Sequence, residues 1–251
     1  MAMEIITIPC LSDNYAFLFR SEDRVVVIDV PEAAPILSVL DAHGWALTDI
    51  LLTHHHWDHI DGVPDLVAAT HAKVWGAAAD AHRLPPLDQA LSPGDVIQIG
   101  REKAEIWDVS GHTIGHIAFI FDGVAFTGDS LMAAGCGRLF EGSAEQMHRS
   151  LTQFSTLPGE TLIASGHEYT SSNLAFATSL EQDNAELKFR VAEVERLRAE
   201  GAPSVPSLLK TERSTNPFLR AHVPALKDAT GTTGQTDQDT FAATRRAKDA
   251  F

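Results

Sequence analysis

The chain has 251 residues, 44% of them hydrophobic, and its formal net charge at pH 7 is −15. This length suits one large domain, or a medium domain with a smaller one. The negative charge argues against nucleic acid or an anionic membrane as the main partner. Because no apolar run reaches about 18 residues, the sequence also predicts no membrane-spanning helix.

Cysteine content and the N-terminus bear on the compartment. Cys10 and Cys136 are too few for a disulfide framework. Met1 to Glu4 lead directly into a strand-like pattern, without the basic region and apolar stretch of a signal peptide. Both features predict a cytoplasmic protein.

Charge is unevenly distributed along the chain. Residues 1–184 have a net charge of −17, whereas residues 185–251 have a net charge of +2. The C-terminal segment is therefore a candidate source of cations for an anionic ligand. The alternative interpretation is that the acidic part is simply a solvated surface.

Up to residue 169 the sequence alternates short extended runs with helical patterns. The extended runs are rich in β-branched and aromatic residues, and turn signals such as Ser12-Asp13-Asn14 separate them. Helical spacing is clear before Gly44, a residue type that commonly ends helices. This order indicates an α/β layered domain. The predicted strands cover residues 5–8, 15–19, 25–28, 50–53, 73–75, 96–99, 104–109, 117–121, 124–127 and 161–164, and the predicted helices cover residues 31–43, 63–70 and 144–156.

Beyond residue 170 the pattern becomes mainly helical. In residues 185–200, apolar side chains recur at three- and four-residue steps, as on one face of a helix. We therefore predict two domains, a catalytic domain of residues 1–169 and a helical substrate-binding domain of residues 170–251. The predicted helices cover residues 172–180, 185–200 and 240–251, and residues 202–236, rich in Pro, Ser and Thr, are interpreted mostly as loop.

A dense cluster of histidines follows the predicted strand of residues 50–53. It contains the pattern His-x-His-x-Asp-His at His54, His56, Asp58 and His59. Imidazole and carboxylate groups are good ligands for zinc and similar divalent ions. Without a cation, four titratable groups this close together would repel one another and lose hydration. The alternative, a loop of solvated histidines, explains the pattern less well.

The spacing of these ligands suggests more than one ion. In an extended segment alternate residues point the same way, so His54 and His56 can bind one ion together. His59 has the opposite parity and can face a second ion. Periodicity alone does not place Asp58, because the chain must turn there.

Three later segments supply further candidate ligands at strand ends. They are His112, Asp129 and His167, each following a predicted strand. Glycines flank all three, and glycine lets the backbone approach a crowded site. Each is a weak candidate alone, and the shared setting strengthens the set. By contrast, His55 and His116 are interpreted as supporting or packing residues, and Cys136 as structural.

Together these motifs resemble the metallo-β-lactamase superfamily, and the finer motifs resemble its glyoxalase II branch, the hydroxyacylglutathione hydrolases. The resemblance runs from about Ile8 to Phe251. The motifs that carry it are Thr53-His54-His55-His56-Trp57-Asp58-His59, Gly111-His112-Thr113-x-Gly115-His116, Thr127-Gly128-Asp129, Gly135-Cys136-Gly137-Arg138, Gly166-His167-Glu168-Tyr169-Thr170, Asn216-Pro217-Phe218 and Arg245-Arg246-x-Lys248-Asp249-x-Phe251.

The resemblance implies an α/β fold, an αββα metallo-β-lactamase sandwich with a smaller helical C-terminal domain. It also implies two divalent metal ions per chain, with zinc as the first expectation and iron or manganese as alternatives. Asp58 and Asp129 are expected to be catalytic as well as metal-binding. The implied ligands are His54, His56 and His112 on one ion, Asp58, His59 and His167 on the other, and Asp129 bridging both.

The family further implies that Arg138, Phe140, Tyr169, Arg245 and Lys248 contact the substrate. Arg245 and Lys248 are three apart on a predicted helix, so they share a face and can meet a carboxylate as a pair. A solvated helix end is the alternative interpretation. Phe140 stands where many members have Tyr, which removes one hydroxyl from the substrate site.

The implied reaction is hydrolysis of S-2-hydroxyacylglutathione by a metal-bridged hydroxide. With S-D-lactoylglutathione the products are glutathione and D-lactate, in the second step of methylglyoxal detoxification. The expected partner is thus a small-molecule thioester, with no nucleic acid and no membrane. The sequence does not define the acyl preference, the metal identity or the oligomeric state. A monomer is one option for the oligomeric state.

Three alternative interpretations compete with the glyoxalase II interpretation. Another metallo-β-lactamase-fold hydrolase, such as a lactonase, β-lactamase or nuclease, and a glutathione persulfide dioxygenase are enzyme alternatives. Gly135-Cys136-Gly137-Arg138 and the basic C-terminal helix argue against them. A non-catalytic metal-binding scaffold protein is a third alternative. Seven candidate ligands, two of them acidic, argue against it, because structural zinc sites usually close with four.

Overall fold

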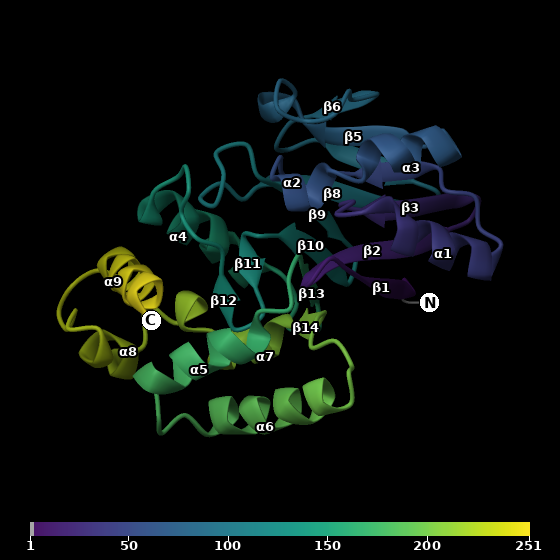
Figure 1. The fold of residues 1–251 in the computed structure, drawn as a ribbon. Helices are drawn as coiled ribbons and strands as arrows, with labels where there is room; N and C mark the ends of the chain where they lie inside the picture. The colour runs from purple at the N-terminus through teal and green to yellow at the C-terminus, as the bar shows by residue number, and fades with distance from the viewer. Residues whose placement is uncertain (1–2) are drawn as a thin grey trace. The chain divides into compact units, whose positions relative to one another are not determined.

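The computed structural model describes residues 3–251, which fold into two compact units (Figure 1). The units interleave along the chain, and the domain boundary after residue 169 stays a prediction. Unit 1 holds the described chain up to Asp108 with Gly115–Gly128 and Ala164–His167, and unit 2 holds Val109–Ile114, Asp129–Ile163 and Glu168–Phe251.

The first sheet of unit 1 has six strands in the order β1-β2-β3-β4-β5-β6. The first three strands are antiparallel neighbours, and β3 to β6 run parallel to one another. Helices connect the parallel strands, as such connections require. The strands are β1 (Ile5–Cys10), β2 (Asn14–Ser21), β3 (Arg24–Ile28), β4 (Asp49–Leu51), β5 (Lys73–Ala77) and β6 (Gln89–Leu91), and the helices are α1 (Ala33–His43), α2 (Trp57–Ile60), α3 (Val63–Thr70) and the 3-10 helix η1 (Ala78–Asp80).

The second sheet of unit 1 is an antiparallel meander. It runs through β7 (Val96–Ile99), β8 (Glu102–Asp108), β9 (Ile117–Phe121) and β10 (Val124–Gly128). The end of β13 (Leu162–Ser165) continues the sheet beside β10. The ends of β10 and β13 thus lie next to each other at one edge.

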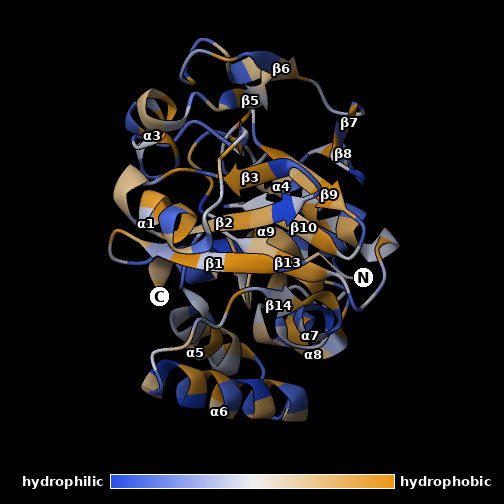
Figure 2. Ribbon diagram, turned by 90° about the vertical axis from the view of Figure 1, so that its right-hand side faces the viewer, coloured by the Kyte–Doolittle hydropathy of each residue, from blue (hydrophilic) through white to orange (hydrophobic). Residues whose placement is uncertain are grey.

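The core of unit 1 is layered, because alternate residues of a strand face opposite sides of its sheet. Phe17 and Phe19 of β2 each lie 5.8 Å from the ring of Phe126 in the second sheet. Ala16 and Leu18 instead join an apolar cluster with residues of α1 and α3. The first sheet is therefore covered by the second sheet on one face and by helices on the other. Figure 2 shows β1 and β2 as largely hydrophobic ribbons.

Unit 2 is mainly helical, and side-chain caps fix where its helices begin. Ser143 forms a capping box with Gln146, and Thr236 forms one with Asp239. A short strand pairs antiparallel with the first two residues of β13. The elements are β11 (Leu131–Met132), β12 (Gly135–Cys136), α4 (Ala144–Thr152), η2 (Gln153–Thr156), α5 (Thr170–Leu180), α6 (Ala185–Ala199), β14 (Ser207–Leu208), α7 (Leu209–Thr215), η3 (Pro217–Leu219), α8 (Pro224–Ala229) and α9 (Asp237–Ala250).

Two apolar groups form the core of unit 2. Leu174 of α5 packs with Leu187 and Val194 of α6. The rings of Phe218 and Phe241 meet edge to face at 5.4 Å. The helix α6 has 15 residues with many charged side chains. None of the helices found in residues 3–251 combines the length and apolar character that a bilayer crossing requires.

The prediction that residues 202–236 are mostly loop is wrong. This stretch contains β14, α7, η3 and α8. Pro217 and Pro224, which contribute to this loop prediction, stand at the starts of short helices, where a missing N–H is harmless. Tertiary burial of Leu209 stabilises α7, and residue propensity alone does not report such burial.

Candidate metal centre

The histidine cluster lies where a buried strand gives way to a short helix. The strand β4 ends at Leu51, and α2 begins at Trp57. The N–H of His59 donates to the carbonyl of His56 at 2.9 Å, which closes the turn. This turn places Asp58 in the first turn of α2, a position that strand periodicity could not predict.

Three predicted ligands in unit 1 converge with their donor atoms facing one another. The Nε2 atoms of His59 and His167 are 3.3 Å apart. The Asp58 Oδ2 atom lies 3.3 Å from the Nε2 of His167 and 3.9 Å from that of His59. Zinc bonds of about 2.0–2.2 Å at tetrahedral angles place donor atoms about 3.3–3.6 Å apart. Two of the three separations match this spacing and the third is slightly wider, so the three atoms suit one face of a divalent metal site.

The other two histidines of the motif adjoin this group. The ring of His54 lies 4.2 Å from that of His59 and 4.8 Å from that of His56, measured between centroids. His54 is fully buried and His56 is partly exposed. Unit 1 thus brings together five of the seven predicted ligands. Two of them, His54 and His56, follow β4, and the other three come from α2 and from the segment after β13.

The imidazoles of His54, His59 and His167 each have a hydrogen-bonding partner at Nδ1. Nδ1 of His59 lies 2.9 Å from Asp29, and Nδ1 of His167 lies 2.9 Å from Asp13. Nδ1 of His54 lies 3.0 Å from the hydroxyl oxygen of Thr53. Such partners engage Nδ1 and leave Nε2 available to bind a metal. The residues present therefore fit a divalent cation.

Asp29 is buried and acts as an acceptor at the rear of the site. Its Oδ1 accepts the Thr53 N–H at 2.8 Å, and its Oδ2 accepts the Thr53 hydroxyl at 2.8 Å. The same Oδ2 faces Nδ1 of His59. A carboxylate oxygen of Asp29 lies within 4.8 Å of ring nitrogens of His54 and His59, as a metal ligand could. Its hydrogen bonds to Thr53 and His59 instead make Asp29 an orienting group. Sequence reasoning missed it, and its place directly after a strand was the available signal.

Asn14 fixes the carboxylate of Asp58. Its amide Nδ2 donates to the Asp58 backbone carbonyl at 2.9 Å and to Oδ2 at 3.1 Å. Asn14 also forms an isolated bridge with His167. The turn Ser12-Asp13-Asn14, read from the sequence only as a turn signal, therefore supplies two side chains that orient ligands.

The histidines that the sequence did not assign as ligands support their neighbours. Nδ1 of His55 lies 3.1 Å from Asp80, which also pairs with Arg83. The ring of His116 stacks on His54 with centroids 4.6 Å apart and planes 13° apart. These contacts make both histidines part of the wall behind the ligands.

Unit 2 brings the remaining two predicted ligands together. Nε2 of His112 lies 3.5 Å from Oδ2 of Asp129. Nδ1 of His112 donates to the backbone carbonyl of Arg138 at 2.8 Å. The arrangement repeats that of unit 1, with Nδ1 engaged and Nε2 facing a carboxylate.

The predicted substrate-binding cations of α9 differ in their surroundings. Arg245 is 4% exposed, and its guanidinium donates to the Cys136 carbonyl at 3.0 Å and to Asp249 at 3.0 Å. The Lys248 amine donates to the Ser172 carbonyl at 3.1 Å. Burial, together with the positive charges of Arg245 and Arg138, lowers the pKa of Lys248. Lys248 thus lies close enough to two other cations for their charges to act on its amine.

The other three predicted substrate residues are exposed. Arg138 lies at the surface, Phe140 is 64% exposed and Tyr169 is 39% exposed. The ring of Phe140 meets that of His112 edge to face at 5.3 Å.

Cys136 is buried, and burial raises the pKa of its thiol to about 11. A thiol that stays protonated at neutral pH is a poor nucleophile.

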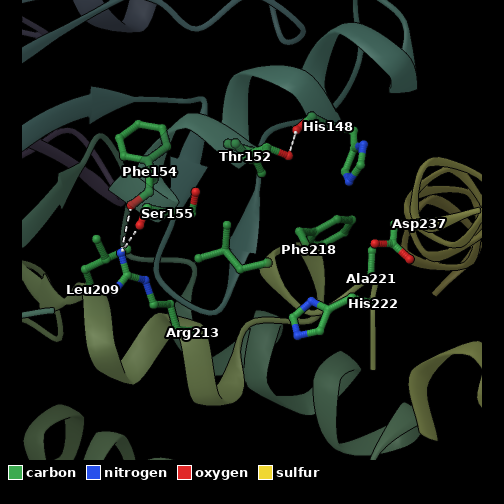
Figure 3. Close-up of a pocket in the computed structure, with 12 residues that line it drawn as sticks. His148, Thr152, Phe154, Ser155, Leu209, Arg213, Phe218, Ala221, His222 and Asp237 are labelled. Carbon is green, nitrogen blue, oxygen red and sulfur yellow. Dashed lines mark hydrogen bonds between the residues drawn. The ribbon is translucent and has the colours of Figure 1, made fainter. Parts of the chain in front are cut away.

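A separate pocket of about 420 Å³ lies within unit 2 (Figure 3). His148 and His222, which no sequence motif connects, both line it. Its charged groups already have partners, since Arg213 donates to the carbonyls of Phe154 and Ser155 at 3.0 Å and Asp237 pairs with a lysine. Within residues 3–251, His148, His222 and Asp237 do not belong to any convergent group of metal-ligand atoms.

Comparison with known proteins agrees with this geometry. Residues 12–167 match the family model of the metallo-beta-lactamase superfamily, and residues 168–251 match that of the hydroxyacylglutathione hydrolase C-terminus. A hydroxyacylglutathione hydrolase of Jannaschia sp. is 59% identical over 252 residues, covering 99% of this chain and 98% of the relative. Another, of Cereibacter sphaeroides, is 56% identical over 255 residues and covers all of both chains.

A solved structure, the di-iron-bound form of TTHA1623, is 26% identical with a TM-score of 0.57. The match covers 65% of this chain and 91% of that one. The two family matches together span residues 12–251, and the relatives align over their full length. The chain therefore belongs to the hydroxyacylglutathione hydrolase, or glyoxalase II, family of the metallo-β-lactamase superfamily.

Proposed function

We propose that this chain hydrolyses S-2-hydroxyacylglutathione thioesters to glutathione and a 2-hydroxy acid. With S-D-lactoylglutathione the acid is D-lactate, formed in the second step of methylglyoxal detoxification. One observation carries the proposal. Asp58, His59 and His167 converge at metal-ligand spacing in a chain 59% identical to a hydroxyacylglutathione hydrolase.

The proposed centre holds two divalent ions, with zinc first and iron or manganese as alternatives, because His/Asp sites accept several ions. The convergent donor atoms and the di-iron relative support this assignment. When bound, such ions would supply Lewis acidity, which can activate water near neutral pH and polarise a carbonyl group. The proposed ligands are His54, His56 and His112 for one ion, Asp58, His59 and His167 for the other, and Asp129 for both.

The carboxylates of Asp58 and Asp129 are the proposed catalytic groups of the chain. Their oxygens can accept hydrogen bonds from the attacking water and so orient it towards the carbonyl. Asn14, through its bonds to Asp58, holds one of these carboxylates in place. The leaving thiol has a pKa of about 8.5, so it departs without a strong general acid.

Substrate binding is proposed for Arg138, Phe140, Tyr169, Arg245 and Lys248. Glutathione carries carboxylates, and Arg138, Arg245 and Lys248 are cations of unit 2 whose charges act on one another. Because Arg245 is already bound to Asp249, its proposed role is to add positive charge from within. Phe140 offers an aromatic surface without a hydroxyl.

The proposed division of labour follows the family matches. Residues 12–167 and 168–251 match different family models, which supports a catalytic domain of residues 1–169 and a helical substrate-binding domain of residues 170–251. A cytoplasmic location is also proposed, in keeping with two free cysteines, Cys10 and Cys136.

Metal analysis paired with a turnover assay tests the function. The purified protein should contain close to two divalent ions per chain and hydrolyse S-D-lactoylglutathione. Chelation should abolish hydrolysis, and zinc, iron or manganese should restore it. Full activity in verified metal-free protein would refute the mechanism. Hydrolysis of a lactone or β-lactam instead, or oxygen uptake with glutathione persulfide, would support one of the alternative enzymes.

A further inference from the structure

Residues 132–138, here the 132–138 segment, include two residues of unit 2, Gly137 and Arg138, that contact His112 or Asp129. The carbonyl of Arg138 accepts the Nδ1 proton of His112 at 2.8 Å. A Cβ atom on Gly137 would lie 2.0 Å from the Asp129 carbonyl and 2.9 Å from Nδ1 of His112. The backbone of the segment therefore touches both residues directly. A shift of the segment would change the orientation of His112.

One residue of the segment has an unfavourable backbone conformation. Ala134 has φ 55°, in the left-handed region that residues with a Cβ rarely adopt. Such a conformation persists only where its surroundings enforce it. The N–H of Ala134 donates to Oε2 of Glu212 at 2.6 Å. Glu212 thus supplies the acceptor for a strained residue.

Asn216 holds the carbonyl groups of the same segment. Its amide Nδ2 donates to the carbonyls of Met132 at 3.0 Å and Gly135 at 2.9 Å, and it lies 3.1 Å from Glu212 Oε2. The amide oxygen of Asn216 accepts the Phe218 N–H at 3.0 Å. Because both ends of the amide are engaged, its orientation is fixed. The motif Asn216-Pro217-Phe218 thereby gains a physical role.

The position of Glu212 is costly unless it serves a specific contact. The side chain is fully buried, and burial raises its pKa. Buried carboxylates need hydrogen-bond donors to offset lost hydration. Glu212 has donors on two sides: Ala134 and Asn216 towards the segment, and the Ser207 hydroxyl at 2.7 Å on the other. The contact with Ala134 positions the segment, whereas the contact with Ser207 only anchors the carboxylate, so the two contacts can be tested separately.

We propose that Glu212 and Asn216 are positioning residues for the metal centre. They hold the 132–138 segment so that the Arg138 carbonyl orients His112. The inference rests on the proposed function, in that His112 is taken as a metal ligand. It adds residues that touch neither metal nor substrate.

The experiment measures metal affinity directly, by competition with a chromophoric chelator, and the absorption spectrum of the cobalt-substituted protein. Glu212→Ala removes the acceptor for Ala134 and should weaken metal binding by about tenfold, the lower end of the effect of groups that orient ligands. It should also shift the cobalt spectrum. Glu212→Gln keeps an acceptor oxygen for the Ala134 N–H and should restore both readouts.

Ser207→Ala is the matched control. It removes a hydrogen bond to the same carboxylate, from the side that does not touch the segment. It should lower the melting temperature while leaving metal affinity and the cobalt spectrum unchanged. If Glu212→Ala also changes only the melting temperature, Glu212 is merely structural and the inference is overturned.

A milder variant covers the case in which Glu212→Ala does not fold. Glu212→Asp keeps the charge but withdraws the oxygen from Ala134, so metal affinity should fall in the same direction; unchanged affinity overturns the inference. Because these readouts need no turnover, they stay independent of the thioester assay. A wild-type protein that binds metal without hydrolysing the thioester would refute the function while the metal data still decide the inference.

Discussion

In unit 1 the imidazoles of His59 and His167 are held by carboxylates, whereas in unit 2 the imidazole of His112 is held by a backbone carbonyl. A carboxylate acceptor gives the stronger, charge-assisted hydrogen bond and raises the basicity of the ligand. It also depends on a single side chain. A backbone carbonyl cannot be removed by substitution, but it moves with the segment that carries it. Ligand orientation in unit 1 is therefore sensitive to substitution of the acceptor side chain, whereas in unit 2 it is sensitive to movement of the backbone segment.

Both units bury charged side chains, but these side chains act on the ligands in different ways. In unit 1 the buried carboxylate of Asp29 faces the ligand His59 directly. In unit 2 the buried carboxylate of Glu212 binds the 132–138 segment, whose Arg138 carbonyl faces His112. Removing one member of a buried polar network leaves its partners unsatisfied. We therefore expect point variants to separate local ligand orientation in unit 1 from segment geometry in unit 2.

The largest effect is expected at Asp29. Asp29→Ala leaves the Thr53 N–H, the Thr53 hydroxyl and Nδ1 of His59 without their buried acceptor. The free energy of unfolding should fall by about 3–4 kcal/mol, a large value for one substitution. Metal affinity should fall by up to about 100-fold. Chemical denaturation and chelator competition measure the two effects.

Asp29→Asn is the matched variant, and it separates the two losses. Asn tolerates the φ of 55° at this position, and its oxygen can still accept the Thr53 N–H. Its NH₂ group, however, points a donor at Nδ1 of His59, which forces the proton onto the ligating Nε2. Metal affinity should therefore fall by at least about tenfold while stability recovers. Wild-type metal affinity in this variant would contradict the orienting role.

The second expected effect distinguishes the two cations of α9. Arg245→Ala leaves the Cys136 carbonyl without its donor and should cost about 2 kcal/mol of stability as well as raising KM. Lys248→Ala, at a more exposed side chain, should raise KM about tenfold with a stability change below about 1 kcal/mol. Thermal unfolding and steady-state kinetics separate them. Equal stability losses would show that both cations are structural.

Sequence patterns predicted the layered α/β region and the ligand candidates, because both depend on local spacing. The cluster from His54 to His59 follows a strand, and the structure gathers it with His167. The orienting residues were not predicted. Asp13 lies 154 positions from His167, and a contact so distant in sequence leaves no local pattern.

The C-terminal part was predicted less well for a related reason. Short elements such as α7 depend on tertiary burial of a few side chains. Glu212 illustrates this, since a charged residue in a polar stretch indicates an exposed position from sequence alone. Arg245 illustrates it too, because the amphipathic pattern of α9 does not reveal that the Arg245 guanidinium is buried against Cys136.

A smaller effect is expected from the pH dependence of ligand binding in unit 2. Burial and nearby positive charges lower the pKa of Lys248. A bound carboxylate favours the protonated amine, so affinity is full below the lowered pKa and declines as pH rises through it. Calorimetric titration with S-methylglutathione, a non-hydrolysable ligand, measures this decline.

Two variants define this pH effect. Lys248→Ala should flatten the decline. Lys210→Ala, at an exposed lysine paired with Glu160, should leave it as in the wild type. A decline that persists in Lys248→Ala would assign the titration to another group, and the proposed contact between Lys248 and a substrate carboxylate would then lose its support.

The smallest effect at neutral pH is expected for the two buried thiols, one in each unit. Burial raises the pKa of Cys10 to about 12 and that of Cys136 to about 11. Cys136→Ser should therefore change activity less than about twofold and stability by about 1 kcal/mol. Loss of hydrolysis in this variant would restore Cys136 as a candidate nucleophile.

At alkaline pH the thiols of both units should affect stability. Their folded pKa values lie above the unfolded value of 9.0, so the unfolded state loses its protons first. The thiol contribution is thus fully present below about pH 8 and declines as pH rises from about 9. Denaturation of Cys10→Ser and Cys136→Ser between pH 8 and 11 measures it; identical slopes in wild type and variants would show that the thiols ionise freely in both units.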